Sequence, residues 1–87
     1  MNVAVISPKT TLFQGTATAV TLPGTLGKFT VLENHAPIVA VLGKGNVEIQ
    51  TVEGEAKQAI AIESGFVEVH HNQVSICVEE TVARQDA

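Results

Sequence analysis

The chain is a single small domain of 87 residues with a net charge of −4, five scattered basic residues and three aromatic residues, all phenylalanine. This composition argues against a nucleic-acid partner, because phosphate binding needs clustered basic side chains and single strands stack on aromatic rings. The one cysteine, Cys77, excludes an intrachain disulfide, and the longest apolar run, residues 38–42, is far shorter than the ~20 residues of a membrane span, so no direct membrane insertion is expected.

Short strand patterns separated by turn residues follow one another along the chain. The expected strands are residues 2–6, 11–14, 16–22, 27–32, 37–42, 46–52, 56–62, 65–70 and 73–79. In the sixth of these, Val47 and Ile49 alternate with polar residues, and the same period of two recurs in the last two. Glycine, proline and asparagine mark the turns, including one at Ser64-Gly65. We therefore predict an all-β fold, a two-layer antiparallel β-sandwich of about eight to ten short strands.

Two of these segments carry apolar side chains on both faces. In residues 37–42, Val39 and Val41 face away from the side that Ile38 occupies, yet all three are apolar. Residues 56–62 show the same property. A sandwich buries only one face of each sheet, so the second face needs a cover. Two such strands in one small domain favour a protein-binding face.

Two motifs that suggest ligand chemistry fail their structural requirements. Residues 24–28 resemble a phosphate loop, but Leu22 stands where the pattern begins with glycine, and Phe29 follows the lysine in place of Ser or Thr. The adjacent His70 and His71 are expected to point to opposite faces of a strand, which would prevent them from binding one metal ion together. Neither motif therefore predicts a cofactor or a metal site.

The candidate nucleophiles are equally weak. Ser64 lacks the flanking glycine pattern of a nucleophile elbow, because position 62 is isoleucine. Cys77 lies in the middle of an expected strand without a basic neighbour to lower its pKa, so structural burial is expected for it. The carboxylates are spread along strands and turns, and nothing marks one as a general acid or base. The sequence thus predicts no catalytic residue.

Two alternative functions stay open on composition alone. Lys44 sits at an expected hairpin tip between two glycines, and biotinyl or lipoyl carrier domains of similar size present a modified lysine on such a tip. Those carriers place the lysine in the context Met-Lys-Met or Asp-Lys-Ala. The glycines on both sides of Lys44 match neither context. A ligand-binding β-barrel would need a large apolar cavity, for which 87 residues offer little room.

One long run resembles a known family. Residues 22–39, LPGTLGKFTVLENHAPIV, resemble the stretch LPG-x-x-G-x-F-x-(I/V)-L-x-N-H-A-P-L of the epsilon subunits of F-type ATP synthases. Residues 5–8 and 12–15 resemble the opening V-(S/T)-P and L-F-x-G of that family, and residues 45–49 and 64–76 resemble its later blocks. The resemblance runs in order over nearly the whole chain, and the Asn-His-Ala-Pro block is its most specific part.

The resemblance implies a non-catalytic subunit of the central stalk, the rotor of the proton-translocating enzyme. Such a subunit docks on the gamma subunit and the c-ring and couples proton flow to ATP synthesis, on the cytoplasmic face of the bacterial inner membrane. The implied candidates for c-ring contact are Lys28, Glu33, Asn34 and His35, of which Lys28 stands where the family often carries another residue. The candidates for contact with the gamma subunit are Ser7, Ile38, Val39 and Val41.

The resemblance also concerns the segment after the sandwich. Family members usually continue into two C-terminal helices that can inhibit ATP hydrolysis and that bind ATP in some members. In this chain the domain is expected to occupy residues 1–80, and residues 81–87 form a short tail that resembles only the entry to the first helix. Neither autoinhibition nor ATP binding is therefore expected.

Overall fold

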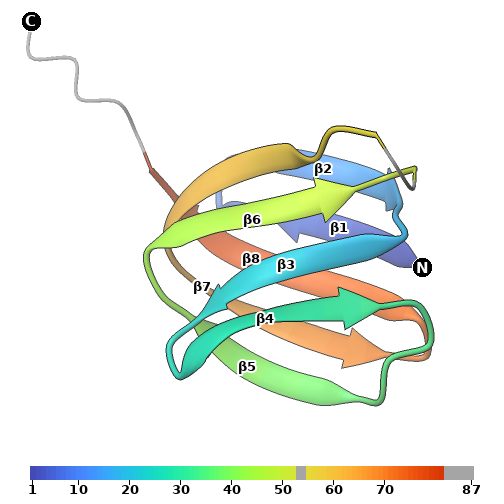
Figure 1. Ribbon diagram of the computed structural model, residues 1–87. Coiled ribbons are helices and arrows are strands. Elements are labelled where there is room, and N and C mark those ends of the chain that lie inside the picture. The colour runs from blue at the N-terminus through green and yellow to red at the C-terminus, as the bar shows by residue number, and fades with distance from the viewer. Residues whose placement is uncertain (53–54, 82–87) are drawn as a thin grey trace, which may run out of the picture.

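The computed structural model describes residues 1–52 and 55–81, and strands make up most of this part of the chain (Figure 1). The strands are β1 (Asn2–Ile6), β2 (Thr11–Thr16), β3 (Ala19–Gly24), β4 (Gly27–Leu32), β5 (Ile38–Leu42), β6 (Gly45–Gln50), β7 (Gln58–His70) and β8 (Gln73–Glu80). The predicted all-β fold is confirmed. No helix in the described ranges is long and apolar enough to cross a membrane. The expected helix entry after residue 81 lies outside the described residues.

The strands form two layers that face each other across the core (Figure 1). One layer contains β4, β3, β6 and the first part of β7. The other contains β2, β1, β8, the second part of β7 and β5. Each layer buries one face, as a sandwich requires, and leaves an outer face for solvent or for a partner.

Strand β7 belongs to both layers because it continues through the position where the sequence predicts a turn. Its residues 58–62 pair with β6, whereas 65–69 pair with β5. The register against β8 shifts between Ile62 and Ser64, and such a bulge bends a strand without ending it. A Cβ on Gly65 would lie 2.8 Å from the carbonyl oxygen of Cys77, so the bend needs glycine there. The expected separation into strands 56–62 and 65–70 is therefore wrong.

One pair of strands departs from the predicted antiparallel arrangement. Strands β1 and β8 lie side by side in parallel, with Val3 opposite Val74 and Val5 opposite Ile76. Parallel neighbours cannot be joined by a hairpin, and here the whole intervening chain connects them. The pairing places the first and the last strand of the domain side by side within one layer. Local sequence patterns could not show this, because the two strands are far apart in sequence.

The core between the layers is aliphatic and consists mainly of valine and isoleucine. Leu22, Val47 and Ile62 are fully buried, one on each of β3, β6 and β7. The alternation predicted for the last strand is confirmed, because Val74, Ile76 and Val78 are all buried. β-Branched side chains pack well on a pleated surface, so these residues stabilise both the strands and the core.

Candidate functional site

The outer face of the layer that contains β1, β8, β7 and β5 carries a row of apolar side chains across those four strands. Val41 of β5 lies opposite Phe66 of β7, and Phe66 lies opposite Cys77 of β8. Cys77 in turn lies opposite Ile6 of β1. Because directly opposed residues point to the same face of a sheet, these four side chains form one line, here called the outer apolar row.

The outer apolar row is open to solvent in the isolated chain. Val41 is 60% exposed, Ile6 44% and Phe66 43%, and the adjacent Val39 is 63% exposed. Single exposed apolar residues are ordinary, but a contiguous group on one sheet face marks an interaction surface. This surface confirms that the second apolar face of residues 37–42 is uncovered within the described chain.

A shallow groove runs along the row and brings Ser7 beside it. The groove is lined by Ile6, Ser7, Pro8, Val41, Phe66, Cys77 and Glu79, among others. Ser7 itself is buried, and its hydroxyl accepts a hydrogen bond from the Thr10 amide and donates one to the Thr10 carbonyl, both at 3.2 Å. Ser7 therefore shapes the turn at the edge of the groove, and its polar atoms already have partners inside the chain.

Carboxylates border the row. Glu68 lies opposite Val39, and Glu79 lies opposite Ser64, next to Phe66 along the sheet. Both side chains belong to exposed residues. The apolar surface therefore has an acidic rim, which favours a partner with apolar groups at the centre of its contact and basic groups at the edge.

Three members of the row were not identified from the sequence as candidate contacts. Phe66 and Ile6 each lie on the outer side of an alternating strand whose inner side is already apolar, and this position is the signal that could have identified them. The burial expected for Cys77 is wrong, because the thiol is exposed. The alternation of β8 explains the error: Ile76 and Val78 point inward, so Cys77 must point outward.

A second apolar groove lies on the other side of β5. It is lined by Leu26, Phe29, Ile38, Val39, Ala40 and Val41, together with the glycines of the neighbouring turn. Ile38, a predicted gamma-subunit contact, is half-buried in this groove and not part of the outer apolar row. Val39 and Val41 border both surfaces, so apolar surface continues around β5.

The four predicted ring contacts do not form one surface. Lys28 stands at the start of β4, whereas Glu33, Asn34 and His35 come after its end. A strand rises ~3.3 Å per residue, which puts Lys28 and Glu33 about 17 Å apart. The two groups therefore lie at opposite ends of the sandwich, here called the hairpin end (residues 24–28 and 43–46) and the Asn34 end (Met1, residues 33–35 and 71–72).

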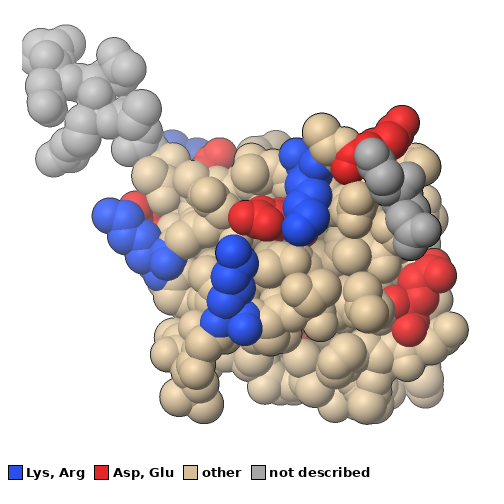
Figure 2. All heavy atoms as spheres, viewed as in Figure 1, with Lys and Arg blue, Asp and Glu red and all other residues tan. Residues whose placement is uncertain are grey.

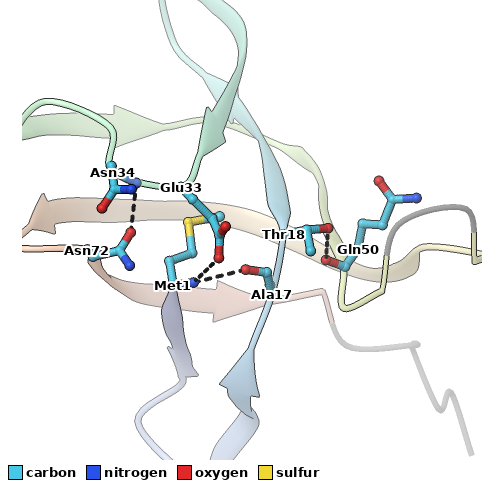
Figure 3. A network of polar contacts seen from close by, with 7 residues as sticks. All are labelled: Met1, Ala17, Thr18, Glu33, Asn34, Gln50 and Asn72. Atoms are coloured by element: carbon cyan, nitrogen blue, oxygen red, sulfur yellow. Dashed lines mark hydrogen bonds and ion pairs between the residues drawn. The ribbon is translucent and has the colours of Figure 1, made fainter.

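Several polar groups of the Asn34 end form hydrogen bonds or an ion pair within the chain (Figure 3). The amino group of Met1 lies 3.0 Å from the Glu33 carboxylate and 3.1 Å from the Ala17 carbonyl oxygen. The backbone amide of Asn34 donates a hydrogen bond to the side-chain oxygen of Asn72 at 2.8 Å. A ring nitrogen of His35 lies 2.7 Å from the Ala36 carbonyl oxygen. These contacts connect the turn after β4 with the start of β1 and with the turn between β7 and β8.

The hairpin end is built from two turns that are fastened together. The β3–β4 turn and the β5–β6 turn exchange backbone hydrogen bonds, from the Thr25 amide to the Val41 carbonyl at 3.0 Å and from the Gly43 amide to the Pro23 carbonyl at 2.8 Å. A Cβ on Gly45 would lie 2.8 Å from the Cβ of Pro23, so the two turns also pack closely. Leu26 projects from this structure and is fully exposed.

Lysines gather on this side of the molecule although the chain is acidic. Figure 2 shows lysine or arginine side chains around a carboxylate on the face formed by β4, β3 and β6. The Lys28 and Lys57 ammonium groups lie 4.0 and 3.7 Å from the two oxygens of Glu48. Lys44 lines the same hollow as Lys28, between the two turns of the hairpin end. The Glu48 carboxylate is thus close to two of these three lysines, Lys28 and Lys57.

The prediction that His70 and His71 point to opposite faces of a strand is wrong. The rings of His70 and His71 lie 3.8 Å apart between centroids, because His71 has a φ of 51° and leaves the strand direction. Asn72 also has a positive φ, of 59°, and two such residues form a tight two-residue hairpin turn. Within the described residues, no group of three or more His, Cys, Asp or Glu side chains is placed to hold a metal ion.

Comparison with known proteins identifies the domain. Residues 1–84 match the family model described as ATP synthase, Delta/Epsilon chain, beta-sandwich domain. The ATP synthase epsilon chain of Leptospira borgpetersenii is 43% identical over 86 residues, which are 99% of this chain and 66% of that protein. The ATP synthase epsilon chain of Nostoc sp. is 38% identical over 90% of this chain and 57% of its own length. The chain therefore spans less than two thirds of these relatives.

Solved structures agree on the fold. A chain in the cryo-EM structure of the Euglena gracilis mitochondrial ATP synthase, OSCP/F1/c-ring, superimposes with a TM-score of 0.82 and 27% identity, over 92% of this chain and 51% of that one. A chain of the Tetrahymena thermophila mitochondrial ATP synthase central stalk and c-ring gives a TM-score of 0.76 at 21% identity, over 92% of this chain and 63% of that one. At this identity the second match shows the fold alone.

Proposed function

The chain belongs to the ATP synthase delta/epsilon family through its β-sandwich domain, and we propose that it acts as a rotor subunit that docks on the gamma subunit and the c-ring. Its relatives are epsilon chains, which are accessory and not catalytic subunits. This membership leaves no support for a carrier function of Lys44. In the proposed role the domain connects the two larger rotor parts, so that proton flow through the ring is coupled to ATP synthesis.

The outer apolar row is the observation that carries this proposal. A subunit that transmits torque has to remain attached to its shaft, which requires a contact with a desolvated apolar centre. Val41, Phe66 and Ile6 offer such a centre on a rigid sheet. We assign this surface to the gamma subunit, with Val39 beside it and Glu68 and Glu79 on its rim.

The position of the row suits simultaneous contact with two partners. Val41 precedes Leu42, which lies opposite Gly24 at the base of the hairpin end. The outer apolar row therefore approaches the hairpin end. The row faces outward from the layer of β1, β8, β7 and β5, whereas the β3–β4 turn belongs to the other layer. One partner can cover the outer face as another contacts an end of the sandwich. A rigid domain held in this way would transmit rotation, whereas loose contacts would allow slip.

Membership in this family also suggests where the protein works. We propose that it is peripheral on the cytoplasmic face of the bacterial inner membrane, held there by its partners. Relatives in the bacteria Leptospira and Nostoc support this location. The proposal includes no ATP binding by the described domain.

Co-expression with the gamma subunit of the same enzyme tests the proposal. The wild-type chain should co-elute with gamma in size exclusion. Val41→Lys should abolish co-elution, because a charge would be buried within the apolar contact. Val52→Lys is the matched control, since Val52 is 53% exposed against 60% for Val41 but lies in the loop after β6. Failure of the wild-type chain to bind gamma, or equal binding by both folded variants, would refute the assignment.

A further inference from the structure

We propose that Glu68 and Glu79 determine which surface can pair with the outer apolar row: they exclude a second copy of this chain and admit a partner that brings basic groups to the same two positions. An exposed apolar group on a rigid sheet face tends to pair with itself unless something opposes the contact. The identity of the partner as gamma rests on the proposed rotor function, whereas the exclusion of a second copy concerns this chain alone.

The two glutamates lie on opposite sides of the row, near its middle. Glu68 is two residues beyond Phe66 on β7, and Glu79 is two residues beyond Cys77 on β8. Residues two apart on a strand share a face and are about 7 Å apart. Because β7 and β8 run antiparallel, with Phe66 opposite Cys77, one carboxylate borders each side of the row.

Neither carboxylate is neutralised within the described part of the chain. The ion pairs of the described residues involve Glu33 and Glu48, and not Glu68 or Glu79. Lys9, in the turn between β1 and β2, pairs with none of these carboxylates in the described structure. The residues that line the groove along the row include Glu79 and no lysine. Both negative charges therefore act on any surface that approaches the row.

A second copy would bring like charges together. Two identical chains that pair through the same surface are related by a two-fold axis. An axis along the row brings Glu68 of each copy close to Glu79 of the other, because the two lie on opposite sides of the row. An axis parallel to the strands brings Glu68 close to Glu68 and Glu79 close to Glu79. In both arrangements carboxylates approach carboxylates, and like charges at an interface oppose association.

A partner with basic groups meets the opposite situation. Its basic side chains would form ion pairs with Glu68 and Glu79, while its apolar centre covers Phe66 and Val41. The same two carboxylates thus oppose one contact and favour the other, which is how specific interfaces discriminate between partners. In the free subunit they keep the exposed row from self-association until the partner covers it.

Three states of the same two positions test the inference by sedimentation equilibrium at low salt. They are the wild-type chain, a neutral double variant (Glu68→Gln with Glu79→Gln) and a lysine double variant (Glu68→Lys with Glu79→Lys). Glu55→Lys is the control, because Glu55 is also exposed but lies between β6 and β7, outside the residues that line the groove. Circular dichroism checks that each variant is folded. Labelling of the exposed Cys77 with iodoacetamide shows whether a dimer uses the row.

The neutral double variant should self-associate at least about tenfold more tightly than wild type, because the row is kept and the repulsion is removed. The lysine double variant and Glu55→Lys should remain as monomeric as wild type, since two basic rims repel each other as two acidic rims do. A mixture of wild-type and lysine-variant chains should form the tightest dimer. Cys77 should be protected in that dimer, and the dimer should weaken as salt rises.

Self-association of the neutral variant no tighter than that of wild type would overturn the inference. A mixture of wild-type and lysine-variant chains that does not pair would overturn it too, as would dimers in which Cys77 reacts as fast as in the monomer.

Titration of the gamma subunit with the same variants tests the choice of partner. The lysine double variant should bind gamma at least about tenfold more weakly than Glu55→Lys does. Equal binding by these two variants would refute the pairing of the glutamates with basic groups. A wild-type chain that does not bind gamma would contradict the proposed rotor function, whereas the self-association series would still decide whether the two glutamates exclude a second copy.

Discussion

Replacing Phe66 with alanine should weaken binding to the gamma subunit about thirtyfold. Phe66 is 43% exposed in the free domain. A fully enclosed aromatic side chain buries about 200 Å², so docking would remove about 90 Å² of Phe66 from water. At ~25 cal/mol per Å² this burial contributes about 2 kcal/mol, and ~1.4 kcal/mol corresponds to a factor of ten in affinity.

The substitution also removes contacts inside the domain, so stability has to be measured together with affinity. Phe13→Ala provides the matched control. Phe13 is half-buried on β2 and packs against the core, opposite Val5, so its side chain faces away from the outer apolar row. Both variants should lose roughly 2 kcal/mol of unfolding free energy, but only Phe66→Ala should lose affinity. Isothermal titration with gamma and urea unfolding give the two quantities.

The reasoning would be refuted if folded Phe66→Ala bound gamma within about twofold of wild type. It would also be refuted if Phe13→Ala lost as much affinity as Phe66→Ala. Either result would mean that the binding surface does not include the centre of the row.

Three further predictions concern the scaffold. Leu22 is fully buried, so Leu22→Ala should lower the free energy of unfolding in urea by about 2–5 kcal/mol; a loss below ~1 kcal/mol would contradict its place in the core. Gly65→Ala should cost about 1–3 kcal/mol in the same assay, because the new Cβ would lie 2.8 Å from the Cys77 carbonyl oxygen, and unchanged stability would mean that the bulge relaxes. Glu33→Gln should cost less than ~1 kcal/mol, because the Glu33 side chain is 57% exposed, and the difference from wild type should shrink in high salt. A salt-independent loss would contradict a screened ion pair.

The alternation of apolar and polar residues allowed most of the fold to be predicted. Val47, Ile49, Val74 and Ile76 are buried where the period of two requires it. The same period would have shown that Phe66, Ile6 and Cys77 share the outer faces of their strands. The predicted burial of Cys77 is wrong because a position in the middle of a strand does not decide which face a side chain occupies, and the period of two turns Cys77 outward.

Two features of the fold could not be predicted from local patterns. A glycine beside a serine indicates a turn and a bulge equally well, and only pairing with β5, β6 and β8 shows that β7 continues through Ser64 and Gly65. The parallel pairing of β1 with β8 depends on contacts between distant parts of the chain.

The candidate ring contacts were predicted as one group because all four belong to the run of residues 22–39 that resembles the family. Lys28 and Glu33 are only five positions apart, yet a strand between them places them at opposite ends of the sandwich. The second basic residue of the hairpin end, Lys44, comes from a different hairpin. The pairing of β3 with β5 and β6, together with the hydrogen bonds between the two turns, brings Lys28 and Lys44 to one surface.

Alkylation of Cys77 tests most directly whether the outer apolar row is the docking face. Cys77 is the only cysteine of the chain, it is exposed, and it lies between Phe66 and Ile6 in the row. Its reaction with iodoacetamide, measured by mass spectrometry of the Cys77 peptide, should be fast in the free chain and at least about tenfold slower in the complex with the gamma subunit. Equal rates in the free chain and in a fully formed complex would contradict docking through this face.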